Sequence, residues 1–170
     1  MTRGARSSGA TLIELITVVL LLGILAAYAL PRFFTRSDFE GRGYFEQALS
    51  GVRYAQKLAI VSGCDIRTAI NSSGFAVDQW MNGGDCRANA GGGLIPVQQP
   101  GGGAFSYPAP SGVTISGSVL FYFDALGRPR EALAGPGFGA TILARQNIVI
   151  SGRTLTIEPE TGYSRCTTGC

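Results

Sequence analysis

The chain has 170 residues and a mass of 17.8 kDa, which suits a single domain with a modest core. Hydrophobic residues make up 45% of it and charged residues only 15%, which excludes a charge-driven disordered chain. Histidine is absent, so serine-type triads, histidine general bases and histidine-ligated zinc are excluded. Most familiar enzyme chemistries are removed with them, and together with the motifs considered below we expect a protein that is not an enzyme and holds no cofactor.

The N-terminal part of the chain contains one long apolar run. From Leu12 to Leu30 the only charged residue is Glu14. As a helix, residues 11–30 would rise about 30 Å, the thickness of the hydrocarbon layer of a bilayer. Arg3 and Arg6 precede the run and predict that its N-terminal end faces the cytoplasm. The sequence therefore predicts a single-pass membrane protein.

Glu14 is costly in such a segment. A central carboxylate costs about 2.5 to 3.5 kcal/mol on insertion scales, and less near the interface, so it generally has a partner. The apolar run follows the candidate cleavage junction after Gly9, so cleavage there would retain the anchor and expose the α-amine of Ala10. This amine on a neighbouring, axially shifted subunit is one expected partner. The alternative is a simple signal anchor with Glu14 near the headgroups.

The string G-A-T-L-I-E-L at residues 9–15, with the apolar run and Pro31, resembles the prepilin motif of type IV pilins and type II secretion pseudopilins. The resemblance implies that a prepilin peptidase cuts after Gly9 and methylates Ala10, and that Glu14 is the assembly glutamate. The family usually has Phe or Met where this chain has Ala10. The implied partners are other major and minor pilins and an inner-membrane assembly platform. The implied location is the inner membrane with a periplasmic C-terminal domain, and then the pilus or pseudopilus.

The expected organisation is a leader at 1–9, a transmembrane and assembly helix at 10–31, an amphipathic helix half at 32–63 and a β-rich head at 64–170. Pro31 predicts a helix kink, and the capping-box pattern of Ser37 and Glu40 predicts a restart after a break near 32–36. An apolar stripe of helical period follows and ends before Gly63. Its members are Phe45, Leu49, Val52, Ala55 and Ala59.

After Cys64 the pattern becomes that of strands. A hairpin is expected around the turn at 72–74, and residues 81–110 are expected to form a long surface loop because they are rich in Gly, Pro and Asn. The expected strands are 65–71, 75–80, 113–116, 119–124, 147–150 and 154–158, with a short last strand after 161–162. The fold class is therefore α+β, with a long N-terminal helix packed on an antiparallel sheet.

Four cysteines follow the apolar run: Cys64, Cys86, Cys166 and Cys170. Spacings of 22 and 4 do not fit pairs of C-x-x-C metal knuckles. An even count beyond an anchor suggests disulfides in an oxidising compartment such as the periplasm. Four cysteines can pair in three ways, and we favour the scheme with two local disulfides, Cys64 with Cys86 and Cys166 with Cys170. The alternative is four reduced, buried cysteines.

Three further segments resemble the GspH/FimT group of minor pilins, and within it the MshC type of the mannose-sensitive haemagglutinin (MSHA) pilus. They lie at residues 54–59, 123–129 and 157–163. This resemblance implies a minor pilin of an MSHA-like type IV pilus. The alternatives are a GspH-like pseudopilin of type II secretion and a FimT-like DNA-binding minor pilin for natural transformation.

The DNA-binding alternative rests on a Gly-Arg-x-Arg motif. Gly127 to Arg130 matches its letters but lies in a mid-domain hairpin, whereas the family motif lies in the C-terminal tail, where only Arg165 remains. Arg128, Arg130 and Arg165 are thus candidate DNA contacts, or alternatively turn residues with solvated heads. The formal charge is +3, and loss of Arg3 and Arg6 with the leader leaves 12 bases against 11 acids. Nucleic acid is therefore not an expected partner.

No catalytic or metal site is expected. Glu158 and Glu160 flank Pro159, which indicates a solvated turn and not an acid/base pair. The glycine-rich segment 135–139 lacks phosphate-loop spacing. Asp78 and Asp85 lie near the expected loop but without the ligand-rich sequence of a calcium site.

Overall fold

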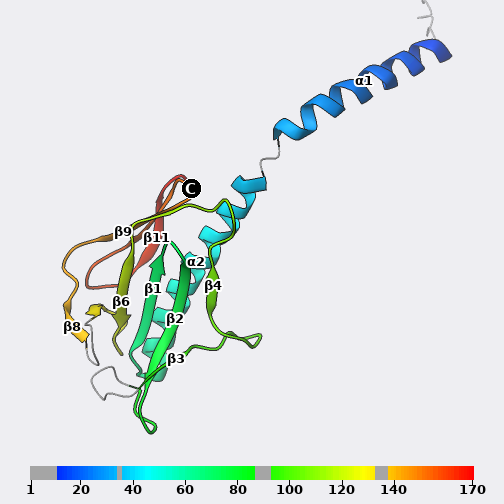
Figure 1. Ribbon diagram of the computed structural model, residues 1–170. Helices are drawn as coiled ribbons and strands as arrows, with labels where there is room; N and C mark the ends of the chain where they lie inside the picture. Colours follow the sequence, from blue (N-terminus) through cyan, green and yellow to red (C-terminus); the bar gives the residue numbers. More distant parts are fainter. Residues whose placement is uncertain (1–10, 34–35, 87–92, 133–137) are drawn as a thin grey trace, which may run out of the picture. The chain divides into compact units, whose positions relative to one another are not determined.

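The computed structural model describes residues 11–33, 36–86, 93–132 and 138–170, in two compact units (Figure 1). The first unit ends at Arg36, and the second runs from Ser37 to Cys170. The expected leader, including Gly9, and the expected methylation site Ala10 lie outside the described residues.

The first unit contains α1 (Leu12–Phe33). Thr11 caps its start, because the Glu14 N–H donates to Thr11 Oγ1 at 3.3 Å and the Leu15 N–H donates to the Thr11 carbonyl at 3.2 Å. The helix continues through Pro31 to Phe33. Within the described parts of the chain no helix has the length and apolar character of a membrane span, in contrast to the span expected over 10–31.

The second unit is built on α2 (Arg36–Ser62). This helix begins one residue before the expected cap at Ser37. It ends where Gly63 adopts a φ of 69° and donates its N–H to the Ala59 carbonyl at 2.9 Å, a helix end that glycine favours. The five residues of the expected stripe are all buried, and Tyr44 and Ala48 widen it. One face of α2 is therefore the apolar face that the sequence predicts.

The described strands of the second unit form two antiparallel sheets. The seven-stranded sheet has the order β3-β2-β1-β6-β7-β8, with β4 also paired to β2, and the four-stranded sheet has the order β11-β10-β9-β5. The strands of the first are β1 (Ile66–Asn71), β2 (Gly74–Met81), β3 (Gly93–Pro96), β4 (Ser106–Pro108), β6 (Val119–Phe123), β7 (Pro129–Ala132) and β8 (Phe138–Thr141). Those of the second are β5 (Ile115–Ser116), β9 (Gln146–Ile150), β10 (Arg153–Ile157) and β11 (Ser164–Thr168).

The core lies between α2 and these strands. Alternate residues of β1 are buried, as a sheet face that packs on a helix requires. In β2 the alternation holds at Phe75 and Val77 and then shifts, because Trp80 is buried with Tyr122 in a separate cluster. Gly51 of α2 permits the approach of the sheet, since a Cβ there would overlap the ring of Phe75. The α+β class with a helix packed on antiparallel sheet is thus confirmed for this unit.

Residues 81–110 do not form the expected loop throughout. β3 and β4 both pair with β2, and Val97 and Phe105, between them in sequence, are only 5% and 8% exposed. The Phe105 ring stacks on Tyr54 of α2, with centroids 5.1 Å apart. The glycine-rich composition concealed these elements, because strands of three or four residues carry too little periodicity to stand out. β7 is the second strand of the hairpin expected at residues 127–130, although no bounds were predicted for it, and β8 was missed for the same reason as β3 and β4.

Candidate functional site

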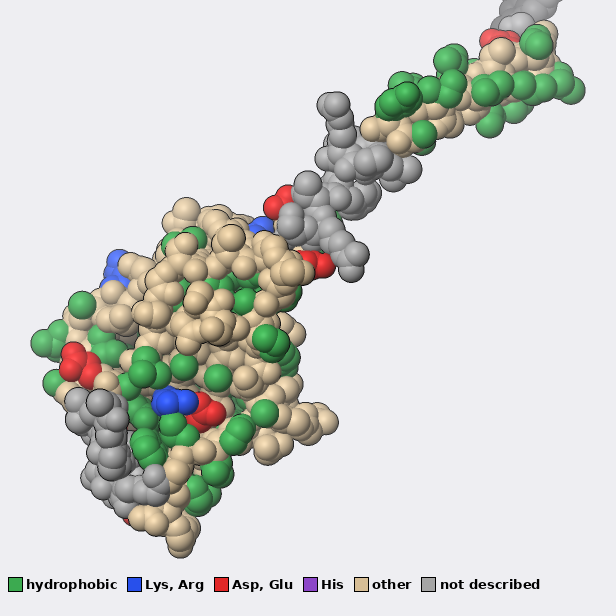
Figure 2. All heavy atoms as spheres, viewed as in Figure 1, with side chains coloured by type: hydrophobic (Ala, Val, Ile, Leu, Met, Phe, Trp, Pro, Cys, Tyr) green, Lys and Arg blue, Asp and Glu red, His purple; other side chains and the backbone are tan. Residues whose placement is uncertain are grey.

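α1 presents an apolar surface on all sides. Every described side chain from Thr11 to Tyr28 is exposed, and Glu14 is the only charged one among them. Leu12, Ile13 and Leu15, the apolar residues closest to Glu14, are 78%, 69% and 62% exposed. Figure 2 shows hydrophobic side chains along the part of this helix whose side chains are described. An apolar surface of this extent is a site for contact with other molecules.

Thr11 is a functional candidate that the sequence reasoning missed. Its hydroxyl oxygen accepts the Glu14 N–H, and Thr11 and Glu14 have the T-x-x-E spacing of a capping box. Thr17 adds a further local contact by donating its hydroxyl to the Glu14 carbonyl at 2.9 Å. Glu14 therefore has a helix-capping position in addition to its place on the apolar surface, and an acid in the first turn also suits the helix dipole. In the sequence, only the T-x-x-E spacing of Thr11 and Glu14 could have indicated this role of Thr11.

The expected partner of Glu14 lies outside the described residues, because Ala10 does. The pairing of the Ala10 amine with Glu14 stays a prediction. Pro31 lies within α1, and its effect on the axis of the helix also stays a prediction.

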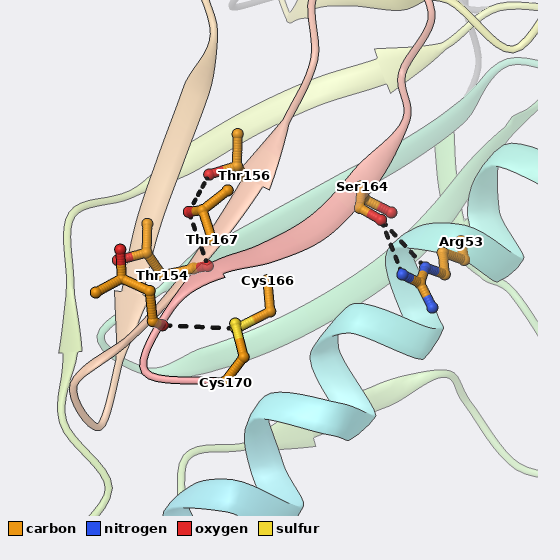
Figure 3. Close-up of a disulfide and its surroundings, with 8 residues drawn as sticks. Arg53, Thr154, Thr156, Ser164, Cys166, Thr167 and Cys170 are labelled. Atoms are coloured by element: carbon orange, nitrogen blue, oxygen red, sulfur yellow. Dashed lines mark hydrogen bonds between the residues drawn. A yellow bond between two sulfur atoms is a disulfide. The ribbon is translucent and has the colours of Figure 1, made fainter.

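Both local disulfides are present. Cys64 and Cys86 are joined with a Cα separation of 5.0 Å, which ties the residue after Gly63 to the segment that follows β2. The Asp65 N–H also donates to the Cys86 carbonyl at 3.1 Å. Cys166 and Cys170 are joined with a Cα separation of 6.0 Å and close a short loop at the C-terminus (Figure 3).

Arg128 is held by a carboxylate of its own turn. Its Nε and Nη2 donate to Asp124 Oδ2 at 3.0 and 2.9 Å, while Asp124 Oδ1 accepts the backbone N–H groups of Leu126 and Arg128 at 3.0 Å each. This bidentate pair neutralises the Arg128 charge locally.

Arg130 and Arg165 are also engaged within the head. Arg130 donates to the Gly139 carbonyl and to Thr141 Oγ1, both at 3.2 Å. Arg165 Nη2 donates to Glu158 Oε1 at 2.6 Å. The three candidate DNA contacts therefore already have intramolecular acceptors, and they come from the β6–β7 turn, β7 and β11.

Glu158 forms an ion pair with a second arginine, since Arg145 Nε donates a hydrogen bond to Glu158 Oε2 at 3.0 Å. Burial acts to raise the pKa of Glu158, but the hydrogen bonds and positive charges of Arg145 and Arg165 outweigh it, and the pKa lies below the ordinary value. Glu160 is exposed in the following turn with a φ of 61°. Glu158 is thus held between two arginines, whereas Glu160 lies exposed in the turn that the sequence predicts.

The remaining sequence candidates are Asp78, Asp85 and the glycine-rich segment 135–139. Asp78 Oδ2 accepts Arg67 Nη2 at 2.6 Å, so its charge is paired. Among the described residues no three potential metal ligands from Cys, Asp and Glu gather at one point. Residues 135–137 of the glycine-rich segment lie outside the described part of the chain.

Comparison with known proteins gives one relative. The chain is 38% identical over 63 residues to the type IV narrow pilus major component PilA5 of Thermus thermophilus. The match covers 37% of this chain and 54% of PilA5, so the chain spans about half the length of the curated relative that it matches. No family model and no solved structure matches. The similarity supports a relationship to the type IV pilin superfamily.

Proposed function

We propose that this chain is a structural subunit of a type IV pilus. The observation that carries the proposal is α1, a helix with exposed apolar side chains on every side and one carboxylate, joined to a folded α+β head. The similarity to a major pilin supports the same assignment. A helix that is apolar all round is covered in its working state, and in a filament identical or related helices would cover it.

In this proposal a prepilin peptidase removes residues 1–9 and methylates Ala10, and the processed subunit resides in the inner membrane until it is assembled. Extraction into the filament then pairs the Glu14 carboxylate with the Ala10 amine of a neighbouring subunit. In a low-dielectric surrounding an unpaired charge is strongly unfavourable, so only the register that brings the two charges together is stable. Glu14 therefore sets the axial position of the incoming subunit on the assembly platform.

The finer assignment is a minor pilin of an MSHA-like pilus, supported by the segments at 54–59, 123–129 and 157–163. A GspH-like pseudopilin would use the same apolar helix and the same kind of head. Gene neighbourhood separates the two assignments. Genes for an MSHA-type pilus beside this gene support the pilin, and a general secretion cluster supports the pseudopilin.

The capping contact at Thr11 makes a sharp experiment possible. Glu14→Gln keeps a side chain that suits the third position of a capping box and removes only its charge, whereas Thr11→Val removes the capping oxygen and keeps the charge. We expect Glu14→Gln to be cleaved and to remain in the membrane fraction without entering sheared filaments. Thr11→Val should lose about 1 kcal/mol of helix stability and still enter filaments.

Two measurements report filament incorporation and N-terminal processing of these variants. Immunoblotting of sheared filaments gives the incorporated fraction, and the intact mass of the membrane form gives loss of residues 1–9 and addition of one methyl group. Entry of Glu14→Gln at the parental level, with an uncut N-terminus in the parent, would contradict the proposal.

A further inference from the structure

The tight turn between β1 and β2 carries the sequence Asn71-Ser72-Ser73. This is the N-x-[ST] spacing of an asparagine glycosylation acceptor. Asn71 is the last residue of β1 and pairs with Gly74, the first residue of β2. The side chains of all three acceptor residues are exposed. The motif therefore lies at a hairpin tip that a modifying enzyme can reach without unfolding the sheet.

The turn holds the acceptor amide in one orientation. The Ser73 backbone N–H donates to Asn71 Oδ1 at 2.8 Å, which forms an Asx turn. Because Oδ1 faces the turn, Nδ2 on the opposite side of the carboxamide is directed away from it. Within the described residues neither Asn71 Nδ2 nor the Ser73 hydroxyl has a hydrogen-bond partner. Both groups that define the motif are thus accessible.

The turn itself is firmly supported. The Ser73 carbonyl accepts the Ala109 N–H at 3.0 Å, which ties the tip to the segment after β4. Gly74 has a φ of 145°, and a Cβ there would clash with the backbone of Tyr107 and Pro108. The acceptor amide is therefore presented from a fixed position.

A shallow hollow of about 250 Å³ lies beside the acceptor amide. Asn71 and Ser73 are among the residues that line it, together with the apolar side chains of Ala69, Ala76 and Pro108 and the hydroxyl of Ser106. The C–H face of a sugar ring suits an apolar surface of this kind, and its hydroxyl groups suit Ser106 and the solvent. A saccharide attached to Asn71 thus has a surface on which to rest.

We propose that Asn71 is a glycosylation site of this protein. The co-substrate is a saccharide whose anomeric carbon is linked to a lipid-borne diphosphate. Asn71 Nδ2 forms a bond to the anomeric carbon, the bond from that carbon to the diphosphate oxygen breaks, and its electron pair stays on the diphosphate. Nδ2 loses one proton to a base of the transferase. The two disulfides support exposure of the head to an oxidising compartment, in which exported chains meet such enzymes.

The test is the intact mass of the full chain isolated from its own cells, followed by fragmentation of the peptide that contains residues 71–73. We expect the parent to carry a saccharide mass on Asn71. Ser73→Ala should lose it, although this variant keeps the backbone N–H that orients Asn71. Ser73→Thr should retain it, because threonine also satisfies the motif.

Ser72→Ala is the matched control, since it changes the neighbouring exposed hydroxyl and leaves the motif complete. It should keep the saccharide. An unmodified parent, or a saccharide attached to Ser72 or Ser73, would overturn the proposal. The readout is a mass and not filament entry, so failure here leaves the pilin assignment to be judged by the Glu14 experiment.

Discussion

Arg53 of α2 donates two hydrogen bonds to the carbonyl oxygen of Ser164, from Nε at 3.2 Å and from Nη2 at 3.0 Å (Figure 3). Ser164 is the first residue of β11, which forms one edge of the four-stranded sheet. The Arg53 guanidinium therefore satisfies a carbonyl oxygen of the edge strand and links the four-stranded sheet to α2. Protecting an edge strand in this way also limits its pairing with other chains.

Removal of this contact should destabilise the head. Arg53→Met keeps most of the apolar stem and deletes both donors, and we expect a loss of about 1.5 kcal/mol in the free energy of unfolding. Lys57→Met, one turn later on an exposed position of α2, is the control and should change stability by less than about 0.5 kcal/mol. Urea denaturation of the purified protein measures both. Equal losses in the two variants would show that the Ser164 contact contributes nothing.

Two glycines of α2 should respond in opposite directions to alanine. A Cβ at Gly51 would overlap the Phe75 ring and lie 2.9 Å from Phe105 Cε1, so Gly51→Ala should cost about 1 to 3 kcal/mol. No atom lies within 4 Å of a Cβ at Gly43, so Gly43→Ala should gain about 0.5 to 1 kcal/mol from helix propensity. Thermal melting gives the sign directly. A stabilised Gly51→Ala protein would contradict the close packing of α2 on β2.

The two disulfides should contribute unequally to stability. Their sequence separations are 22 and 4, and chain-entropy arguments assign about 3 kcal/mol to the longer loop and about 2 kcal/mol to the shorter. Replacing both cysteines of one pair by serine isolates each contribution. The denaturant midpoint of the variant without the Cys64–Cys86 bond should therefore be lower than that of the variant without the Cys166–Cys170 bond. The reverse order would indicate that strain or residual structure outweighs loop length.

Acid should weaken the cluster around Glu158. The pKa of Glu158 in the folded protein lies below its ordinary value of 4.5, so the cluster stabilises the fold above that pH. This contribution is lost as the pH falls through the lowered pKa, because protonation removes the charge that Arg145 and Arg165 bind. The melting temperature of the parent should therefore drop more steeply below pH 4.5 than that of Glu158→Gln. Parallel pH profiles would exclude a stabilising role for the cluster.

DNA binding provides a further test of the arginine assignments. Arg128 is paired with Asp124, and Arg130 donates to Gly139 and Thr141, so we expect no DNA retardation in a gel shift at low salt. Figure 2 shows few and scattered Lys and Arg side chains on the face of the head that it displays. Retardation that weakens with salt and disappears in Arg128→Ala/Arg130→Ala would restore the DNA-binding alternative.

Local patterns account for the parts of the fold that the sequence predicts well. The buried stripe of α2 repeats with the helical period, and β1 and β2 flank a turn that ends in Gly74, so each signal lies within a few neighbouring residues. The prepilin-like string around Glu14 is equally local. The short strands β3 and β4 gave no such signal, since only their pairing with β2 makes them strands.

The sequence by itself determined the apolar N-terminal helix with its single carboxylate, the amphipathic helix and the strand-rich head, because periodicity and turn residues act over short stretches of chain. Only the tertiary structure decided the acceptors of the arginines, the burial of Val97 and Phe105 and the presentation of Asn71 on a supported turn. Several of these features join residues far apart in the sequence, as between Arg53 and Ser164 or between Ser73 and Ala109, and such contacts exist only once helix and strands have packed together. The pairs Arg128 with Asp124 and Ser73 with Asn71 are close in sequence, but they depend on the geometry of a turn, which the residue pattern does not specify.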